Sequence, residues 1–214
     1  MSSKDPIHLE RRDAVAGLRL QSPSAGRNAG PIADIVVEVL PENARVLEIA
    51  SGTGEHAVSI CSKRPDLTWQ NSDPDERSRQ SQDGWREDLP NQLANSLAID
   101  TTQQNWWSEL QDYDAIYCAN MIHIAPWEAA LGLAKGAELL IGKGGTVILY
   151  GPFLEGEQTA ESNLRFDMNL KTRNPSWGVR SLDSVKHIFA DVGFTLSARI
   201  EMPAENRILI FSRT

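Results

Sequence analysis

The chain has 214 residues, 41% of them hydrophobic, and a formal net charge of −8 at pH 7. This length suits one well-buried domain and is too short for two comfortable ones. The acidic balance argues against a broad phosphate-binding surface, so we expect no nucleic-acid partner. Met1–Gln21 lacks an apolar signal core, and no apolar run is long enough to span a bilayer. We therefore expect a cytoplasmic protein without a membrane partner.

The two cysteines, Cys61 and Cys118, fall in apolar surroundings within a predicted helix and a predicted strand. This placement favours buried thiols in a reducing compartment over a disulfide framework. The four histidines are scattered and have no ligand spacing with the cysteines. The sequence therefore predicts no metal site.

The first forty residues contain an arm, a loop and one helix. Met1–Gln21 is polar and poorly patterned, which predicts an N-terminal arm that is mobile at its start. Ser22–Asn28 is rich in turn-forming residues and predicts a loop. Pro31 is expected to open an amphipathic helix that Pro41 ends. A single domain is predicted over residues 22–214.

The next segment predicts a strand, a tight turn and a helix. Arg45–Ile49 contains β-branched and aliphatic residues that end abruptly at small ones, as in a short buried strand. Ala50–Gly54 has glycines where the backbone needs positive φ or a close approach. Glu55–Arg64 resumes a helical pattern. The turn thus leads to a helix N-terminus, where free N–H groups favour a polar or anionic ligand, as in the first βα unit of nucleotide-type folds.

Two cofactor classes use such a unit. The run from Gly52 to Ala57 matches the dinucleotide fingerprint G-x-G-x-x-G/A. However, Glu48 at the strand end would repel a dinucleotide's phosphates, whereas it suits the ammonium group of S-adenosylmethionine. The pattern resembles motif I of the class I methyltransferases, and a nicotinamide-dependent oxidoreductase stays open as the alternative. A glycine turn without a ligand is disfavoured, because Glu48 would then be a carboxylate near the core without a partner.

Further strands and helices alternate along the chain, which is typical of a parallel α/β sheet. The predicted strands are Leu67–Ser72, Asn95–Ile99, Tyr113–Ala119 and Thr146–Tyr150, and the predicted helices are Glu76–Glu87 and Pro126–Ile141. Tyr113–Ala119 is apolar apart from Asp114 and is expected at the centre of the sheet.

The C-terminal third breaks this alternation. Residues 151–180 are polar and are expected to form a helical cover over the site, before a helix over Ser181–Val192. Phe194–Met202 and Arg207–Arg213 are separated by four residues, a connection that can only join antiparallel strands. We therefore predict an α/β, Rossmann-like class I methyltransferase fold. It would have a seven-stranded, mostly parallel sheet, a C-terminal antiparallel hairpin and helices on both faces.

Several blocks of the chain together resemble the methyltransferase-like 26 family, a group within the class I S-adenosylmethionine-dependent methyltransferases. The blocks are Ser22–Asn28, Val46–Gly54, Cys118–Ile124 with Pro126–Glu128, Leu149–Phe153, Trp177–Arg180, and Met202–Ala204 with Asn206. Ala50 stands where the general class I pattern usually has its first glycine. The methyltransferase-like 26 family resembles this chain in that departure. The resemblance implies the fold and S-adenosylmethionine as cofactor, and it supplies no known acceptor.

The class pattern also implies positions around the cofactor. Glu48 would face the methionine amino group, and Gly52 and Gly54 would lie under the ligand. Asp73, nineteen residues past Gly54, would meet the ribose. Asp100 would accept from the adenine amine, with a turn-forming role before Thr101 as the alternative. The further cofactor positions expected are Ala50, Ser51, Ile99, Asn120, Arg27 and Asn28, of which the last two have loop capping as their alternative.

The catalytic candidates follow the fourth strand, since α/β sheets bind ligands at the carboxyl ends of strands. Asn120 and His123 are expected to face the transferable methyl, with His123 as a general base or an orienting group. The alternative is a histidine satisfied by backbone groups. Tyr150 ends the fifth strand nearby and is expected to donate a hydrogen bond.

The acceptor is expected to meet Trp127, Trp177 and Arg180. Core packing is an equal alternative for Trp127, and Arg173 is a further candidate with a solvated surface role as its alternative. The predicted function is S-adenosylmethionine-dependent methyl transfer to an unidentified small molecule. Besides the oxidoreductase, a cofactor-binding interaction protein with little catalysis stays open, as does the oligomeric state.

Overall fold

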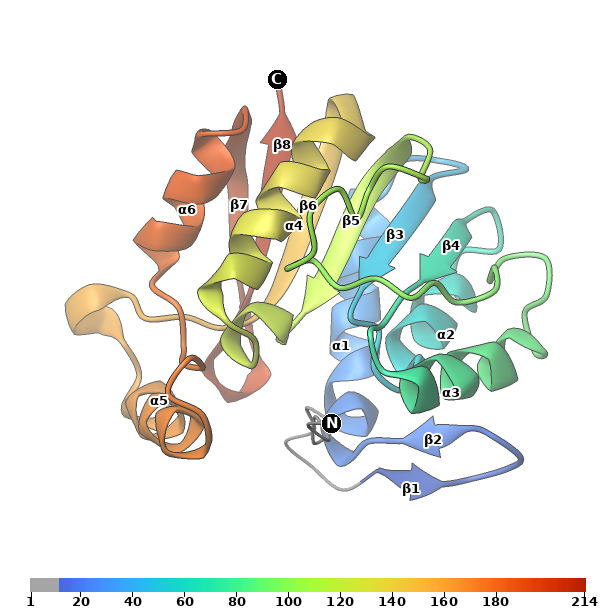
Figure 1. Ribbon diagram of the computed structural model, residues 1–214, viewed down its shortest axis with the longest axis horizontal. Helices are drawn as coiled ribbons and strands as arrows, with labels where there is room; N and C mark the ends of the chain where they lie inside the picture. Colours follow the sequence, from blue (N-terminus) through green and yellow to red (C-terminus); the bar gives the residue numbers. More distant parts are fainter. Residues whose placement is uncertain (1–11) are drawn as a thin grey trace.

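A six-stranded mixed sheet runs through the middle of the molecule (Figure 1). The computed structural model describes residues 12–214, so the start of the predicted arm, residues 1–11, lies outside the described part. The strand order is β4-β3-β5-β6-β8-β7. The strands are β3 (Arg45–Ile49), β4 (Thr68–Asn71), β5 (Tyr113–Ala119), β6 (Ile141–Pro152), β7 (Phe194–Met202) and β8 (Asn206–Arg213).

The strand directions agree with the predicted fold class. β4, β3, β5 and β6 are parallel to one another, whereas β8 runs antiparallel to both β6 and β7. The closing hairpin and the central position of β5 are therefore confirmed.

The predicted strand Asn95–Ile99 is wrong as a full strand. Leu97 makes a single bridge to Ser72, in which Leu97 N–H donates to the Asn71 carbonyl at 3.0 Å. The next ladder residue, Asn95, does not bridge to β4, and its carbonyl accepts instead from the Gln70 side-chain amide at 2.6 Å. The sheet consequently has six strands in place of seven.

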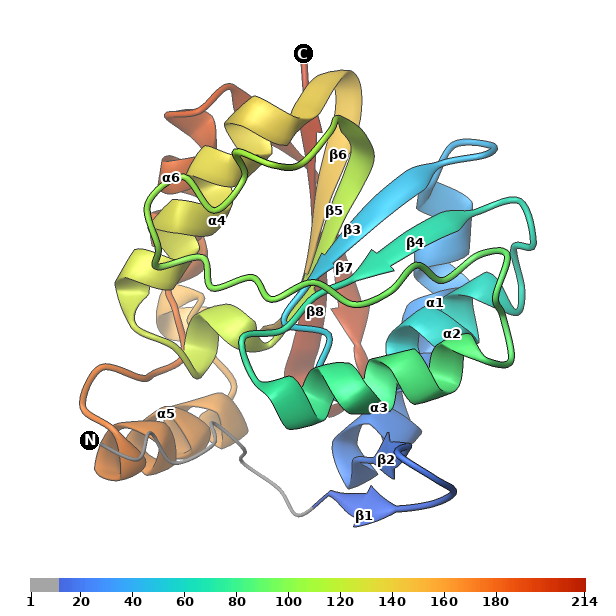
Figure 2. The ribbon, with the colours of Figure 1, turned by 45° about the vertical axis from the view of Figure 1, so that its right-hand side comes forward.

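Helices cover both faces of the sheet, as predicted (Figure 2). They are α1 (Pro23–Val39), α2 (Glu55–Cys61), α3 (Glu76–Arg86), α4 (Trp127–Leu140), α5 (Glu161–Arg173) and α6 (Leu182–Ala190). One core lies under α4 and α6 and includes Leu47 and Ile49; the other lies under α1 and α2 and includes Val46. Alternate residues of β3 thus enter opposite cores, as the twofold period of a strand requires.

The loop predicted over Ser22–Asn28 is instead the first part of α1. Ser22 caps the helix by accepting from Ala25 N–H at 3.5 Å, and Pro23 at the first helical position presets its φ. Pro31 therefore lies inside the helix, where it removes one backbone hydrogen bond. Burial of Ile32, next to this proline, helps to offset that loss.

Residues 12–21, the described part of the predicted arm, include a short hairpin of β1 (Asp13–Ala14) and β2 (Leu20–Gln21). The hairpin packs on α3. Arg19 Nε donates to the Gly84 carbonyl at 2.9 Å, and Leu20 N–H donates to Ser81 Oγ at 2.8 Å. These bonds fix this stretch against the domain.

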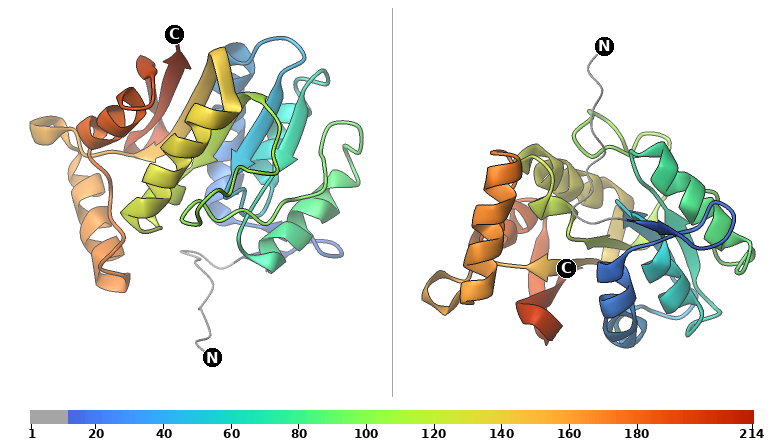
Figure 3. Two further views of the ribbon diagram at one scale, coloured as in Figure 1. Left: turned by 45° about the horizontal axis from the view of Figure 1, so that its top comes forward. Right: turned by 90° about the horizontal axis from the view of Figure 1, so that it is seen from below.

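The cover segment contains α5, which lies apart from the sheet at the edge where the parallel strands end (Figure 3). It is held there by Asn163, whose Nδ2 donates to the Glu205 carbonyl at 3.0 Å, and by Asp167, which accepts from Val179 N–H at 2.9 Å. In the described part of the chain, no helix combines the length and apolar character needed to cross a bilayer.

Candidate functional site

The sheet has a topological switch point between β3 and β5. After β3 the chain crosses to β4 on one side, and it then returns to place β5 on the other side of β3. Ala50 and Asn120, which follow these two strands, both adopt left-handed conformations, with φ of 56° and 61°. Such strained non-glycine residues concentrate at functional sites. In open α/β sheets, ligands bind in the crevice outside a switch point of this kind.

A cavity of about 680 Å³ opens at this point. Its volume lies in the range of small-molecule sites. The lining residues come from α1, from the ends of β3, β5 and β6, from α5 and from the β7–β8 connection. They include Arg12, Ser24, Arg27, Asn28, Ala50, Ala119, Asn120, His123, Tyr150, Phe166, Asn169, Arg173, Met202 and Asn206.

The glycine turn lies beside the cavity, and we call Ala50–Gly54 together with Asp73 the turn wall. Ala50 lines the cavity, whereas the other members of the turn wall lie behind it. Gly54 has φ of 89° and begins α2, and a Cβ at Gly54 would lie 3.2 Å from the Gln82 Cα. Both the backbone angle and this close approach require glycine. Ser51 Oγ donates to the Glu48 carbonyl at 3.3 Å and accepts from the backbone N–H of Ser72 at 3.1 Å, so β3, β4 and the turn are tied together.

Asp73 follows β4 and is held by the turn. Gly52 N–H donates to its Oδ2 at 3.0 Å, and Asp75 N–H donates to its Oδ1 at 2.9 Å. Burial raises the pKa of Asp73 to about 6, although these two hydrogen bonds and the positive charge of Arg12 oppose the shift. A buried, fixed carboxylate beside the turn is suited to accept from ligand hydroxyl groups.

Glu48 lies behind the turn and does not line the cavity. Its side chain is 1% exposed, and Trp69 Nε1 donates to its Oε2 at 2.9 Å. Burial raises the pKa of Glu48 to about 8, which the hydrogen bond from Trp69 only partly opposes. Asn71, which pairs with Glu48 in the sheet register, is fully buried and has no hydrogen-bond partner for either side-chain atom among the described residues. This leaves a desolvated carboxylate beside unsatisfied amide groups.

His123 lies in the single turn that follows β5, and its backbone contacts hold the imidazole in one tautomer. Nδ1 accepts from the backbone N–H of Arg180 at 3.2 Å, so Nε2 carries the proton of the neutral ring. Burial, assisted by the Arg180 charge, lowers the pKa of His123 to about 3. At neutral pH, Nε2 is therefore a hydrogen-bond donor, and this arrangement suits an orienting group better than a general base.

The donor atom of His123 lies beside a glycine. A Cβ at Gly151 would lie 2.6 Å from His123 Nε2 and 3.2 Å from Asn120 Oδ1. No described residue satisfies Nε2. The two predicted catalytic side chains thus gather over one glycine of β6, with a buried donor still to be satisfied.

A chain of hydrogen bonds runs from the core to the cavity. Tyr117 Oη and His56 Nδ1 are 3.1 Å apart, and His56 Nε2 and Asn28 Oδ1 are 2.9 Å apart. Since an amide oxygen only accepts, Nε2 donates to Asn28, and Nδ1 accepts from Tyr117. Burial lowers the pKa of His56 to about 4, which keeps the ring neutral. The Asn28 side chain also hydrogen-bonds the Tyr150 hydroxyl. Burial raises the pKa of Tyr150, and this hydrogen bond lowers it. With Asn28 donating to it, Tyr150 presents its own O–H to the cavity.

The opposite side of the cavity is the α5 wall, which we define as Ser162, Phe166, Asn169 and Arg173. These residues recur at helical spacing and all line the cavity. Sequence reasoning missed Phe166 and Asn169, although their spacing from Arg173 was a readable signal. Arg12 was also missed, and nothing in its local sequence indicated its position beside the turn.

The structure does not bring all predicted residues to this cavity. Trp127 and Arg180 line a second cavity of about 440 Å³, and Trp177 lines neither. The Arg180 guanidinium donates to the carbonyls of Ile122, Ala125 and Ser176 at 2.7–2.8 Å and stacks over Trp127 at 5.5 Å. These bonds give Arg180 a structural role, and neither Trp127 nor Arg180 lines the cavity that contains His123.

The two remaining cofactor candidates from the third predicted strand have local roles. Ile99 is 5% exposed and belongs to the core under α4. Asp100 accepts from the backbone N–H of Thr102 at 2.9 Å and from its hydroxyl at 2.7 Å. This is the turn-forming role that was the alternative for Asp100.

Both cysteines are buried and free, as predicted. Among residues 12–214, no group of three or more His, Cys, Asp or Glu side chains is arranged to hold a metal ion.

Solved structures with the same fold are methyltransferases. An O-methyltransferase family protein from Burkholderia thailandensis superposes with a TM-score of 0.76 at 16% identity, over 89% of this chain and 57% of that one. CalO1, a methyltransferase of calicheamicin biosynthesis, gives 0.73 at 13% identity, over 89% and 54%. An O-methyltransferase family 2 protein from Planctomyces limnophilus gives 0.75 at 16% identity, over 89% and 60%. The chain thus spans little more than half the length of these proteins, and at such low identity the likeness shows the Rossmann-like methyltransferase fold.

The family assignment comes from the sequence itself. Residues 19–213 match the family described as "Protein of unknown function (DUF938)". The match includes the glycine turn, the switch point and α5, and it begins after Arg12. Since it extends over most of the chain, this protein belongs to the DUF938 family.

Proposed function

We propose that the protein is an S-adenosylmethionine-dependent methyltransferase that acts on a small-molecule acceptor. The observation that carries the proposal is the cavity at the switch point, which Ala50 lines together with Asn120 and His123. The structural relatives support it: CalO1 was solved in its SAH-bound form, and the Planctomyces limnophilus protein in complex with apigenin. Membership of the methyltransferase-like 26 group is part of the same proposal and rests on the sequence blocks.

The residues present suit this cofactor. Ala50 and Ala119 leave space at the ends of β3 and β5, and Asp73 is a fixed acceptor for ribose hydroxyls. Glu48 lies behind the turn, where its raised pKa of about 8 leaves the carboxyl largely protonated at neutral pH until a cation is bound beside it. Its desolvated carboxylate has no cation in an ion pair among the described residues, so an ammonium group nearby would be stabilised by it. Arg27 and Asn28 would close this side from α1.

Bound S-adenosylmethionine supplies a methyl group on a positively charged sulfur. In transfer, an acceptor lone pair would bond to that methyl carbon, and the electron pair of the broken carbon–sulfur bond would stay on sulfur. The protein contributes alignment and exclusion of water. His123 Nε2–H and the Tyr150 hydroxyl would orient the acceptor by donating hydrogen bonds, and His123 takes no proton at neutral pH.

Calorimetry with S-adenosylhomocysteine, NAD and NADP tests the cofactor class. We expect S-adenosylhomocysteine to bind and the dinucleotides not to bind. Binding of a dinucleotide alone would favour the oxidoreductase alternative.

Incubation with methyl-labelled cofactor and fractions of metabolites, RNA and protein then tests the acceptor class. Label should enter the metabolite fraction. Label confined to RNA or protein would contradict a small-molecule acceptor, and binding without any transfer would favour a cofactor-binding interaction protein.

A further inference from the structure

We propose that the acceptor is an organic anion, bearing a carboxylate or a phosphate, that Arg173 and its neighbours on the α5 wall recognise. This inference rests on the proposed function, because it assigns the substrate class of the same cavity. The cavity is lined by three arginines, and Arg173 lies on a different wall from Arg12 and Arg27.

The positive charge of the cavity contrasts with the rest of the chain. The sequence has 29 Asp and Glu against 21 Lys and Arg. Among the described residues that line the cavity, the charged side chains are Arg12, Arg27 and Arg173, and none is acidic. In so acidic a chain, a cavity lined by arginines alone concentrates positive potential where an anion would enter.

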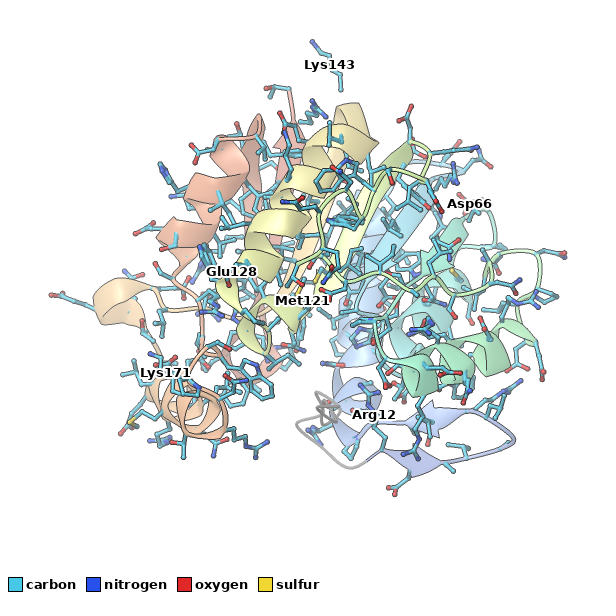
Figure 4. All side chains as sticks on the ribbon, in the orientation of Figure 1. Arg12, Asp66, Met121, Glu128, Lys143 and Lys171 are labelled. Carbon is cyan, nitrogen blue, oxygen red and sulfur yellow. The ribbon has the colours of Figure 1, made fainter. Side chains whose placement is uncertain are left out.

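The three arginines lie on two different walls. Arg12 lies over the turn wall, with its guanidinium 3.4 Å from where a Cβ of Gly52 would be, and it interacts favourably with Asp73 and Asp75. Arg27 belongs to α1, and its charge acts on the Tyr150 hydroxyl. Arg173 belongs to α5, which lies across from α1 and the β1–β2 hairpin (Figure 1), and Figure 4 shows the α5 residue Lys171 well apart from Arg12. Arg12 and Arg27 are thus placed to meet the carboxylate end of a cofactor, whereas Arg173 is placed to meet the acceptor.

The rest of the lining also favours an acceptor that accepts hydrogen bonds. Asn169 lies one helical turn before Arg173 on the same face of α5 and adds an amide donor. The Tyr150 hydroxyl is directed as a donor by the chain through Asn28 and His56. Phe166, half-buried on the same face, offers an apolar surface to the body of the ligand. A guanidinium with flanking donors matches carboxylate and phosphate groups, and does so better than a lysine would.

The outer face of the same helix supplies a matched control. Arg165 has the same chemistry and lies on α5, but it points away from the cavity and pairs with Glu161 at 3.1 Å. Replacing Arg165 therefore removes the same charge from the same helix without changing the cavity wall.

The test uses the full chain saturated with S-adenosylhomocysteine and two pairs of probes: benzoate with benzamide, and phenyl phosphate with phenol. Calorimetry should show that at least one anion binds about tenfold more tightly than its neutral partner. Arg173→Gln should remove that preference, and Arg165→Gln should retain it. The pair that shows the preference identifies carboxylate or phosphate as the recognised group.

Equal or absent binding within both pairs would overturn the inference, and so would a preference that survives Arg173→Gln. Affinity for S-adenosylhomocysteine is measured first in the same samples. Its absence would contradict the proposed function, independently of the result with the four probes. If that affinity is absent, the four probes are compared on the protein alone. An anion preference lost in Arg173→Gln would then leave the anion site standing without the methyltransferase.

Discussion

The turn wall, which reaches the cavity through Ala50, and the α5 wall, which lines it along one helix face, are held in different ways. In the turn wall, backbone N–H groups and buried side chains bond to one another, as between Gly52 and Asp73. The α5 wall instead consists of side chains on a helix anchored through a few buried positions, Asn163, Asp167 and Leu170. Backbone geometry changes little when side chains are replaced, whereas a helix face changes with each substitution. The first wall therefore suits a constant ligand, and the second suits a ligand that differs between related proteins.

The largest effect is expected at His123, between the two walls. His123→Ala should lower the rate of methyl transfer by about 10²-fold, the typical loss when one oriented donor is removed, while affinity for S-adenosylhomocysteine stays unchanged. His123→Gln, which retains an N–H donor, should recover part of the rate. Radiolabel transfer into the metabolite fraction measures this, with the exposed His187→Ala as control.

The pH dependence separates orientation from base catalysis. Because the pKa of His123 lies at about 3, the wild-type rate should show no rise between pH 5.5 and 7.5 that depends on this residue. A rise in this interval that disappears in His123→Gln would show that the imidazole titrates there and acts as a base.

The next largest effect concerns Glu48, behind the turn wall. Its folded-state pKa of about 8 lies above the ordinary value of 4.5, so its contribution to stability is fully present below pH 4.5 and is lost as the pH rises through 8. Glu48→Gln cannot ionise and should gain stability over the wild type across this interval, at about 1.4 kcal/mol per unit of pKa shift. Urea unfolding of both proteins from pH 5 to 9, without ligand, measures the difference. A difference that does not change with pH would contradict the buried ionisation.

A smaller effect is expected from the turn itself. Gly54→Ala introduces a side chain at positive φ and 3.2 Å from the Gln82 Cα, and should lower the free energy of unfolding by about 1–3 kcal/mol. Gly156→Ala is the control, since Gly156 has φ of 60° with open space around it, and should lose only the strain of about 1 kcal/mol. Equal losses would mean that the turn is not tightly packed against α3.

The smallest effect on stability should come from the α5 wall. Phe166→Ala should lower the free energy of unfolding by less than about 1 kcal/mol, because the ring is only half-buried, and should leave affinity for S-adenosylhomocysteine unchanged. Leu164→Ala, on the exposed outer face of α5, provides the comparison. A marked loss of cofactor affinity in Phe166→Ala would mean that the two walls are coupled.

The same difference between the walls explains what the sequence could predict. β3 and β5 were predicted with their observed bounds because apolar runs and glycines encode them locally. The third predicted strand failed because a side chain from β4, that of Gln70, bonds to the carbonyl of the next ladder residue, Asn95, which no local pattern reveals. Asp73 and Asn120 were identified through their places at strand ends. Arg180 could not be placed, since its role depends on carbonyls more than fifty residues away.

Arg12 reaches the cavity from a segment that Arg19 and Leu20 fasten to α3, and its own Nη1 donates to Ser78 Oγ of the same helix at 2.7 Å. The turn of this hairpin exposes Val15 and Leu18, with 51% and 62% of their surface accessible. A single proteolytic cut there would leave the sheet, the turn and α5 intact while freeing the segment that holds Arg12 in place. Preparations clipped at this loop would fold normally and still lose one of the positive charges that line the entrance to the site.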